Sequence, residues 1–223
     1  MDEINENHIY VEVSGRHVHL SKKDIDVLFG SNYKLTKFKD LSQPGQFAAN
    51  EKVTLVNGDK SYDNVRILGP ERPESQIELS MTDCFGLNLR APVRLSGDLV
   101  NTPGIKLVGP CGEVKLVRGV IVAARHVHCN PQEAQILNIQ HNQEISIMIK
   151  GERETVFDNV IVRVDPNFKL AVHLDTDEGN AAQIIGSTFG SIVKRGEIHS
   201  VSNVNSNISK SKKMAKLVIN KKV

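Results

Sequence analysis

The chain has 223 residues, enough for one large domain or for two small domains of about 100 residues each. Its formal net charge of +2 is too small to indicate a nucleic-acid or membrane partner by itself, and no run approaches the roughly 20 apolar residues of a membrane span. The cysteines, Cys84, Cys111 and Cys129, lie far apart without a Cys-x-x-Cys pair, which favours reduced thiols in a cytosol-like compartment.

Short strands broken by Gly, Pro and Asn are predicted from about residue 8 to residue 189. In chain order, the clearest of them are 9–13, 52–56, 76–79, 119–122, 145–149 and 170–174. Two short helices are indicated. Ser21 is a typical N-cap for the first, which Gly30 ends, and Asn130 followed by Pro131 starts the second. This pattern predicts a mainly β fold built from small barrels or sandwiches.

An internal repeat organises these elements. The tetrapeptide Arg-His-Val-His occurs at 16–19 and again at 125–128, and a predicted helix follows each copy. The segment Asp-Asn-Val at 63–65 recurs at 158–160, an offset of 95 that also carries 77–79 onto 172–174. We interpret the repeat as a gene duplication with unequal loops, which gives two small β domains, each a barrel or a sandwich with a short helix after its motif. The first is predicted to span 16–115, with a Gln-Pro-Gly-Gln loop, and the second to combine 8–15 with 116–190.

The last part of the chain differs in kind. After Glu197 the sequence contains lysines and no acidic residue, and the stretch from Ser200 to Asn207 is rich in Ser and Asn. Residues 191–223 are therefore predicted to form a basic, flexible tail.

The repeated motif predicts two metal sites. Residues i and i+2 of a strand face the same side, so the two histidines of each motif point together. Two imidazoles supply half of a tetrahedral zinc shell, and a third protein ligand leaves one position open for catalysis. Two residues at equivalent places of the repeat, Glu78 and His173, each interrupt an apolar strand, where a polar group is costly unless it is paired or bound to metal. The expected ligand sets are His17, His19 and Glu78 for one site, and His126, His128 and His173 for the other.

An anion site is expected beside the first metal site. Arg72 lies six residues before Glu78 in a loop stiffened by proline, and arginine suits the capture of phosphate or carboxylate. Ser14 and Gly15 offer backbone N–H groups just before the first motif. The chain has no Walker loop, no Gly-x-Gly-x-x-Gly after a strand and no signature of a protein nucleophile. Any nucleophile is therefore expected to be water or a co-substrate.

Several motifs, taken in order, closely resemble those of the phosphate propanoyltransferases (PduL-type phosphotransacylases). The resemblance spans about residues 9–190 and is highly specific. It is carried by the segments Ser-Gly-Arg-His-Val-His-Leu at 14–20, Asp-Leu-Ser-Gln-Pro-Gly-Gln-Phe-Ala at 40–48, Asn-Val-Arg-Ile-Leu-Gly-Pro at 64–70, Ala-Ala-Arg-His-Val-His at 123–128 and His-Leu-Asp-Thr-Asp-Glu-Gly-Asn-Ala-Ala at 173–182.

The resemblance implies paired β-barrels, a site with two Zn²⁺ per chain, and the reaction of acyl-CoA with phosphate to give acyl phosphate and CoA. The family's metal ligands fall on the same six residues that the repeat nominates, and its phosphate-binding, catalytic arginine falls on Arg72. Its coenzyme A contacts fall on Val13, Ser14, Gly15, Arg66 and Asn180. A family lysine aligns with Asp59, so Lys60, the next residue, is the nearest equivalent.

The expected mechanism is direct attack of a phosphate oxygen on the thioester, with zinc polarising the carbonyl and stabilising the thiolate. We expect the Glu78 site, the nearer to Arg72, to engage the thioester sulfur, and the three-histidine site to keep water or phosphate. Family members in microcompartments carry an amphipathic N-terminal helix, whereas here only about eight polar residues precede the first strand. A cytosolic enzyme is therefore expected, with an acyl-phosphate kinase as a downstream partner, although the unusual tail leaves encapsulation open. A homodimer is expected because it is the commonest oligomer.

Two rival functions follow from the same residues. A di-zinc centre can activate water against a thioester, ester or amide, which would make the chain a hydrolase. A duplicated His-x-His barrel also resembles a bicupin, which would bind metal and a small ligand without catalysis. Cupins usually carry a glutamate a few residues after the second histidine, and the segment 20–23 provides none.

Overall fold

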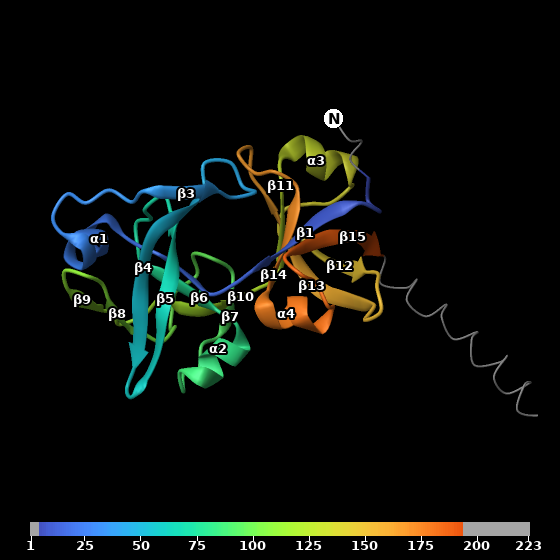
Figure 1. Ribbon diagram of the computed structural model, residues 1–223. Coiled ribbons are helices and arrows are strands. Elements are labelled where there is room, and N and C mark those ends of the chain that lie inside the picture. The colour runs from blue at the N-terminus through green and yellow to red at the C-terminus, as the bar shows by residue number, and fades with distance from the viewer. Residues whose placement is uncertain (1–4, 194–223) are drawn as a thin grey trace, which may run out of the picture.

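Two β units lie side by side in the computed structural model, which describes residues 5–193 (Figure 1). The mainly β fold class is confirmed: one unit is a closed barrel and the other a curled sheet that forms half a barrel. The predicted basic tail falls almost wholly on residues 194–223, which lie outside the described part of the chain. None of the helices in residues 5–193 is long and apolar enough to cross a membrane.

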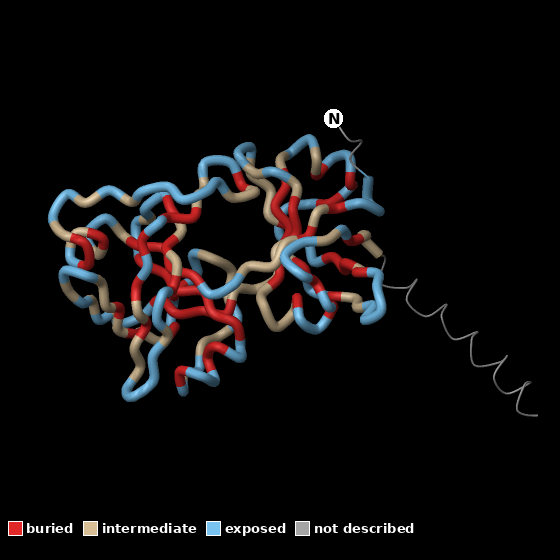
Figure 2. The backbone as a smooth tube through the Cα atoms, in the orientation of Figure 1, coloured by how far each residue is buried: buried red, intermediate tan, exposed pale blue. Residues whose placement is uncertain are grey.

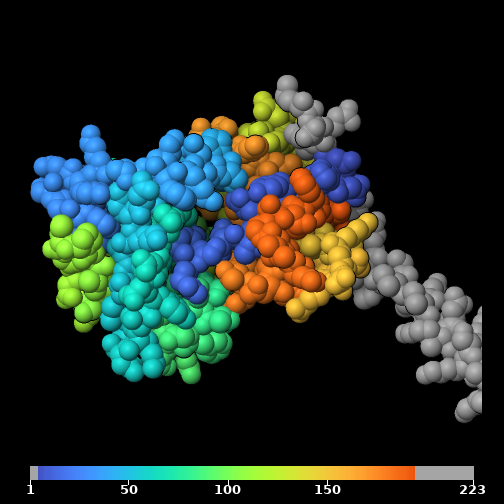
Figure 3. Space-filling view, viewed as in Figure 1, coloured from blue at the N-terminus to red at the C-terminus, as the bar shows by residue number. Residues whose placement is uncertain are grey.

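The closed barrel contains six strands in the order β1, β14, β11, β13, β12 and β15. Their bounds are β1 Ile9–Ser14, β11 His126–Cys129, β12 Glu144–Ile149, β13 Thr155–Val164, β14 Ala171–Asp175 and β15 Ser187–Val193. The N-terminal strand β1 pairs with both β14 and β15 and so closes the barrel of the second half. In Figure 3 the blue residues of the N-terminal part accordingly lie against the orange residues from the later part of the chain.

The other unit is a nine-stranded sheet in the order β7, β10, β6, β2, β5, β4, β8 and β9, with β3 paired to β4. Its strands are β2 His17–His19, β3 Lys37–Asp40, β4 Phe47–Asn57, β5 Lys60–Gly69, β6 Gln76–Leu79, β7 Val93–Arg94, β8 Lys106–Val108, β9 Glu113–Lys115 and β10 Val120–Ala123. The strand β10 thus pairs in this sheet, beside β6. The domain boundaries inferred from the sequence stay a prediction.

The two units repeat the same local pairing around their Arg-His-Val-His strands. The strand β2 runs antiparallel to β6 and parallel to β5, and β11 runs antiparallel to β14 and parallel to β13. Inside each parallel partner, where its pairing with the next strand shifts register, an asparagine (Asn64 in β5, Asn159 in β13) adopts the left-handed region, with φ of 59° and 57°. The sequence offset of 95 therefore reappears as an equivalent register in space.

Each unit also carries two short helices with polar caps. These are α1 Lys22–Phe29, α2 Met81–Gly86, α3 Pro131–Ile136 and α4 Thr176–Ala181. The caps of α1 at Ser21 and Gly30 are confirmed, as is Asn130 at the start of α3. The helices α2 and α4 follow β6 and β14, and each begins with a capping box that ties an N-cap residue to an acidic residue three positions later.

Two separate apolar cores, seen as the red segments of Figure 2, hold the strands in place. In the barrel, Ile147 is fully buried, whereas Ile185 on the surface has 94% of its area exposed. Deletion of the buried side chain leaves a cavity, so Ile147→Ala should lower the free energy of unfolding by about 2–5 kcal/mol. Ile185→Ala is the matched control and should change it by less than about 0.5 kcal/mol in the same denaturant titration. Equal effects of the two substitutions would contradict this packing.

The Gln-Pro-Gly-Gln loop crosses from the first unit to the barrel, above the space between them in Figure 1. Gln43 is buried, and its amide makes a two-point contact with the backbone of Lys169: Nε2 donates to the carbonyl at 2.9 Å, and the Lys169 N–H donates to Oε1 at 3.2 Å. Ser42 donates a hydrogen bond to Glu12 of β1 at 2.5 Å. The loop therefore closes the site on the side away from the β6–β10 strands.

Candidate metal centre and anion site

The first donor group comprises His17, His19 and Glu78. The antiparallel register places His17 directly opposite Glu78 on the neighbouring strand. The carboxylate lies 3.5 Å from the Nε2 atom of His17 and 3.8 Å from that of His19. Burial raises the pKa of Glu78, but the two imidazoles and a hydrogen bond from Ser96 outweigh it and lower that pKa to about 2. The carboxylate is thus ionised at neutral pH.

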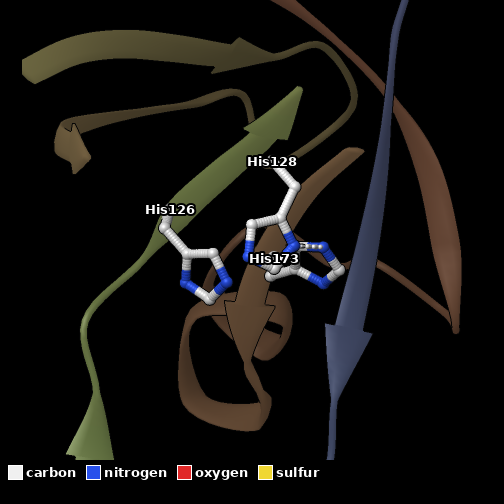
Figure 4. Close-up of side chains that lie close together, drawn as sticks. All are labelled: His126, His128 and His173. Carbon is white, nitrogen blue, oxygen red and sulfur yellow. Dashed lines mark hydrogen bonds between the residues drawn. The ribbon is translucent and has the colours of Figure 1, made fainter. Parts of the chain in front are cut away.

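The second donor group comprises His126, His128 and His173, shown in Figure 4. Two of the rings come from β11 and the third from β14, directly opposite His126. The Nδ1 atom of His128 lies 3.1 Å from the Nε2 atom of His173. Burial, followed by repulsion from the neighbouring imidazoles, lowers the pKa of His126 and His128. Neutral rings keep the lone pairs that a metal ion needs.

The residues of both groups fit a divalent metal ion. The ligand atoms of each group lie within 4.8 Å of one another, and tetrahedral zinc with bonds of about 2 Å holds its ligand atoms a little over about 3 Å apart. In each motif the first histidine has its Nδ1 atom 2.9 Å from the carbonyl oxygen two residues earlier, which leaves Nε2 for a ligand. Within residues 5–193, the buried Nε2 atom of His128 has no hydrogen-bond partner. Nitrogen-rich donor sets of this kind favour zinc or another borderline transition metal.

A carboxylate behind the second group holds His173 in place. Glu12 of β1 lies 3.0 Å from the Nδ1 atom of His173, and Ser42 bonds to the same carboxylate oxygen. Burial opposes ionisation of Glu12, but these two hydrogen bonds outweigh it and lower its pKa. A carboxylate at this place fixes the tautomer and direction of a ligating imidazole. Glu12 is not among the residues predicted from the sequence, although its charge in the otherwise apolar strand β1 was a signal.

Glu12→Gln should therefore weaken metal binding by the three-histidine group about 10- to 100-fold, because the amide carries no charge to support the imidazole. Competition of the apo-protein with a chelator measures this affinity. The first donor group is the internal control, and its affinity should stay unchanged. Equal weakening of both groups would show that Glu12 acts on the fold and not on His173.

Two arginines without an acidic partner face the same space. Arg72 donates a hydrogen bond to the Ser96 hydroxyl at 2.9 Å, and Arg163 lies on β13 beside His128. Burial lowers the pKa of both guanidinium groups, and each keeps its charge because free arginine titrates far above neutral pH. Within residues 5–193, no carboxylate forms an ion pair with either one. Two half-buried positive charges that face the same space attract an anion, so these arginines are candidates for an anion site.

The sequence analysis found Arg72 but missed Arg163. Its counterpart at the repeat offset is Leu68, so the duplication gave no sign of it. Ser96 was missed as well. Its hydroxyl accepts a hydrogen bond from Arg72 at 2.9 Å and donates one to the Glu78 carboxylate at 2.9 Å. Gln76 donates to the same hydroxyl at 2.8 Å. This network ties the anion site to the first donor group.

Both donor groups and both arginines line one cavity of about 780 Å³ between the two units. Three of the sequence-predicted coenzyme A contacts, Val13, Ser14 and Gly15, line it, and so does Arg66, which stacks on Phe38 at 4.7 Å. The remaining two, Lys60 on the β4–β5 hairpin and Asn180 on α4, are exposed and lie outside this lining. The role of all these contacts stays a prediction. The cavity therefore brings two groups of metal-type donors and two arginines together.

Comparisons with known proteins agree on one family. The family model described as phosphate propanoyltransferase matches residues 10–185. A phosphate propanoyltransferase of Thermotoga maritima is 48% identical over 177 residues, which cover 79% of this chain and 84% of that protein. Those of Enterococcus faecalis and Clostridioides difficile are 47% identical over 189 residues and 46% identical over 187 residues. They cover 85% and 84% of this chain, and 90% of each relative.

Proposed function

Because the chain belongs to the phosphate propanoyltransferase family and is thus a phosphate acyltransferase, we propose that it interconverts short-chain acyl-CoA plus phosphate with acyl phosphate plus CoA at a di-zinc site. One observation carries the proposal: two metal-type donor groups face a single cavity together with two half-buried arginines that form no ion pair with a carboxylate in residues 5–193. Metal-type donors alone would suit many reactions. Arg72 and Arg163 add a place for inorganic phosphate, which is the co-substrate that distinguishes a phosphotransacylase from a hydrolase.

Phosphate would be held by Arg72 from the first unit and Arg163 from the second. Their guanidinium groups supply planar N–H donors that match the oxygens of phosphate and offset its negative charge. The Ser96 hydroxyl, fixed by Gln76 and Glu78, is held at 2.9 Å from Arg72 and so fixes the direction of that guanidinium. Phosphate fixed in this way presents one oxygen to the thioester carbonyl carbon. The C–O bond forms as the C–S bond breaks, and the electron pair leaves with the CoA sulfur.

Two zinc ions would be held by His17, His19 and Glu78, and by His126, His128 and His173. Bound zinc supplies Lewis-acid polarisation of a thioester carbonyl and stabilises a thiolate. The chain's own contribution is orientation: the backbone carbonyls of Gly15 and Ala124 and the Glu12 carboxylate fix the tautomer and the direction of the imidazoles that they contact. Fixing two co-substrates beside each other is itself worth several kcal/mol of the barrier.

Coenzyme A would enter along β1. The backbone of Val13, Ser14 and Gly15 and the side chain of Arg66 line the cavity on this side, and Lys39 adds a positive charge at the rim. Basic side chains suit the phosphates of the nucleotide half of coenzyme A. The contacts of Lys60 and Asn180, the homodimer, the downstream kinase and the cytosolic location stay predictions.

The proposal is tested by following free thiol from acetyl-CoA and propanoyl-CoA with and without phosphate. Thiol release that requires phosphate, with acyl phosphate trapped as a hydroxamate, is the expected result. Release at the same rate without phosphate would make the chain a hydrolase. No release from either thioester, with metal bound, would favour a binding protein and overturn the proposal.

A further inference from the structure

An arginine stands directly before each His-Val-His strand, and in both units it reaches the same place. Arg16 binds Asp83 of α2 through Nε at 2.9 Å and through a terminal nitrogen at 2.5 Å. Arg125 binds Glu178 of α4 through Nε at 2.7 Å. These acids lie five residues after Glu78 and His173, the third members of the two donor groups. Each ion pair therefore joins the residue before the first ligand to the helix that follows the third ligand.

Each acidic partner serves two purposes with its two oxygens. Asp83 accepts from Arg16 with Oδ1, and with Oδ2 it accepts from the backbone N–H of Ser80 at 3.3 Å, in the capping box of α2. Glu178 accepts from Arg125 with Oε1, and with Oε2 from the backbone N–H of Asp175 at 3.0 Å. Since the caps directly follow the strands β6 and β14, the arginines are anchored to the ends of the third-ligand strands.

An aromatic ring supports each arginine from the other side. The Arg16 guanidinium lies 4.4 Å from the centre of the Tyr62 ring, and that of Arg125 lies 5.3 Å from the centre of the Phe157 ring. Tyr62 packs so closely on α2 that a Cβ atom added at Gly86 would lie 1.8 Å from its hydroxyl oxygen. The acids are sheltered, with side-chain exposures of 5% for Asp83 and 17% for Glu178. Each arginine is thus held between a ring and a shielded carboxylate.

These contacts differ from an ordinary surface ion pair. Arg118 also binds a carboxylate through two nitrogens, that of Glu74 at 2.7 and 3.1 Å, but both of its partners are about half exposed. Such pairs contribute little to stability. The pairs of Arg16 and Arg125 recur at equivalent positions of the repeat that also carries the metal-type ligands.

We propose that Arg16 and Arg125 are positioning residues that preorganise the two metal sites, each acting on the site of its own unit. This inference rests on the proposed di-zinc function. Arg16 directly follows Gly15, and Arg125 directly follows Ala124. The ion pair of each arginine keeps the backbone of the preceding residue in place. The Gly15 and Ala124 carbonyls then orient Nδ1 of His17 and His126 at 2.9 Å. Gly15 has more conformational freedom than Ala124, so the loss of Arg16 should have the larger effect.

The test measures zinc affinity of the apo-protein by chelator competition, without coenzyme A or phosphate. Two backgrounds isolate the sites: His126→Ala with His128→Ala leaves the first donor group, and His17→Ala with His19→Ala leaves the second. Arg16→Gln is expected to weaken the first group about 10- to 100-fold and leave the second within about twofold, and Arg125→Gln to do the reverse. Arg16→Lys, which keeps one charged contact to Asp83, should recover part of the loss. Arg118→Gln is the matched control and should change neither site.

Thermal melting of each apo variant separates positioning from folding. If Arg16→Gln weakens both sites equally and lowers the melting temperature, the arginine supports the fold as a whole and the proposal is wrong. If it leaves the zinc affinity of the first group within about twofold, the ion pair has no role in the metal site and the proposal is also wrong. Neither result depends on acyl transfer, so a failure of the proposed function would show separately, as phosphate-independent thiol release by the wild-type protein.

Discussion

Arg72→Ala should lower phosphate-dependent release of thiol from propanoyl-CoA by at least about 100-fold. The physical reason is that Arg72 is half-buried, keeps its charge and has no carboxylate partner within residues 5–193, so the proposed phosphate is expected to neutralise that charge. Removal of one preorganised donor to a reacting oxyanion commonly costs 100- to 1000-fold in rate. The KM for phosphate should rise, whereas the KM for propanoyl-CoA should change little. Steady-state kinetics with each substrate varied in turn measures both.

Three further variants make this result specific. Arg163→Ala should act in the same direction, since its guanidinium faces the same cavity. Arg72→Lys keeps the charge but loses the planar fork, so it should fall between wild type and the alanine variant. Arg118→Ala removes an exposed arginine outside the cavity and should have wild-type kinetics. Ser96 links Arg72 to the Glu78 carboxylate, so the metal content of Arg72→Ala is measured as well. It is expected to stay at the wild-type level. An alanine variant with full phosphate-dependent activity and intact metal would refute the phosphate site.

Metal removal should abolish the reaction, with a loss of about 1000-fold or more. Lewis-acid stabilisation at such a centre is worth several kcal/mol of the barrier, and each 1.4 kcal/mol corresponds to a factor of ten. Activity of the dialysed, chelator-treated protein should return on addition of zinc. Because the two donor groups face the same cavity, His17→Ala and His128→Ala should each be as damaging as chelation.

His141→Ala provides the control for these histidine variants. His141 is exposed, lies outside both donor groups and only accepts a hydrogen bond from the backbone of Val164. Its removal should leave activity and metal content unchanged. If the chelated protein kept its activity, or if either ligand variant were fully active, the reaction would not use the metal sites.

The metal-type donors could be read from the sequence because they depend on local rules. The alternation of side chains along a strand puts His17 beside His19, and the repeat offset carries Glu78 onto His173. The mainly β fold and the caps at Ser21 and Asn130 followed from short-range patterns in the same way. Turn chemistry and strand period act over a few residues, so no tertiary information was needed.

The features that were missed depend on contacts between distant segments. Arg163 and Glu12 reach the site only because β13 lies beside β11 and because β1 inserts into the barrel of the second half. The closure of the barrel depends in the same way on the pairing of β1 with β15. The helices α2 and α4 did leave a local signal, since Ser80 with Asp83 and Asp175 with Glu178 form capping boxes. At six residues each, they were too short to show helical periodicity.

The central claim is that the duplicated motif builds two metal sites of unlike ligands. Elemental analysis of the purified protein tests it most directly, with the wild type compared with the double variants His17→Ala/His19→Ala and His126→Ala/His128→Ala. The account predicts two zinc ions per chain in the wild type and one in each double variant. A wild-type protein with fewer than about one ion per chain, or a double variant that still holds two, would contradict it.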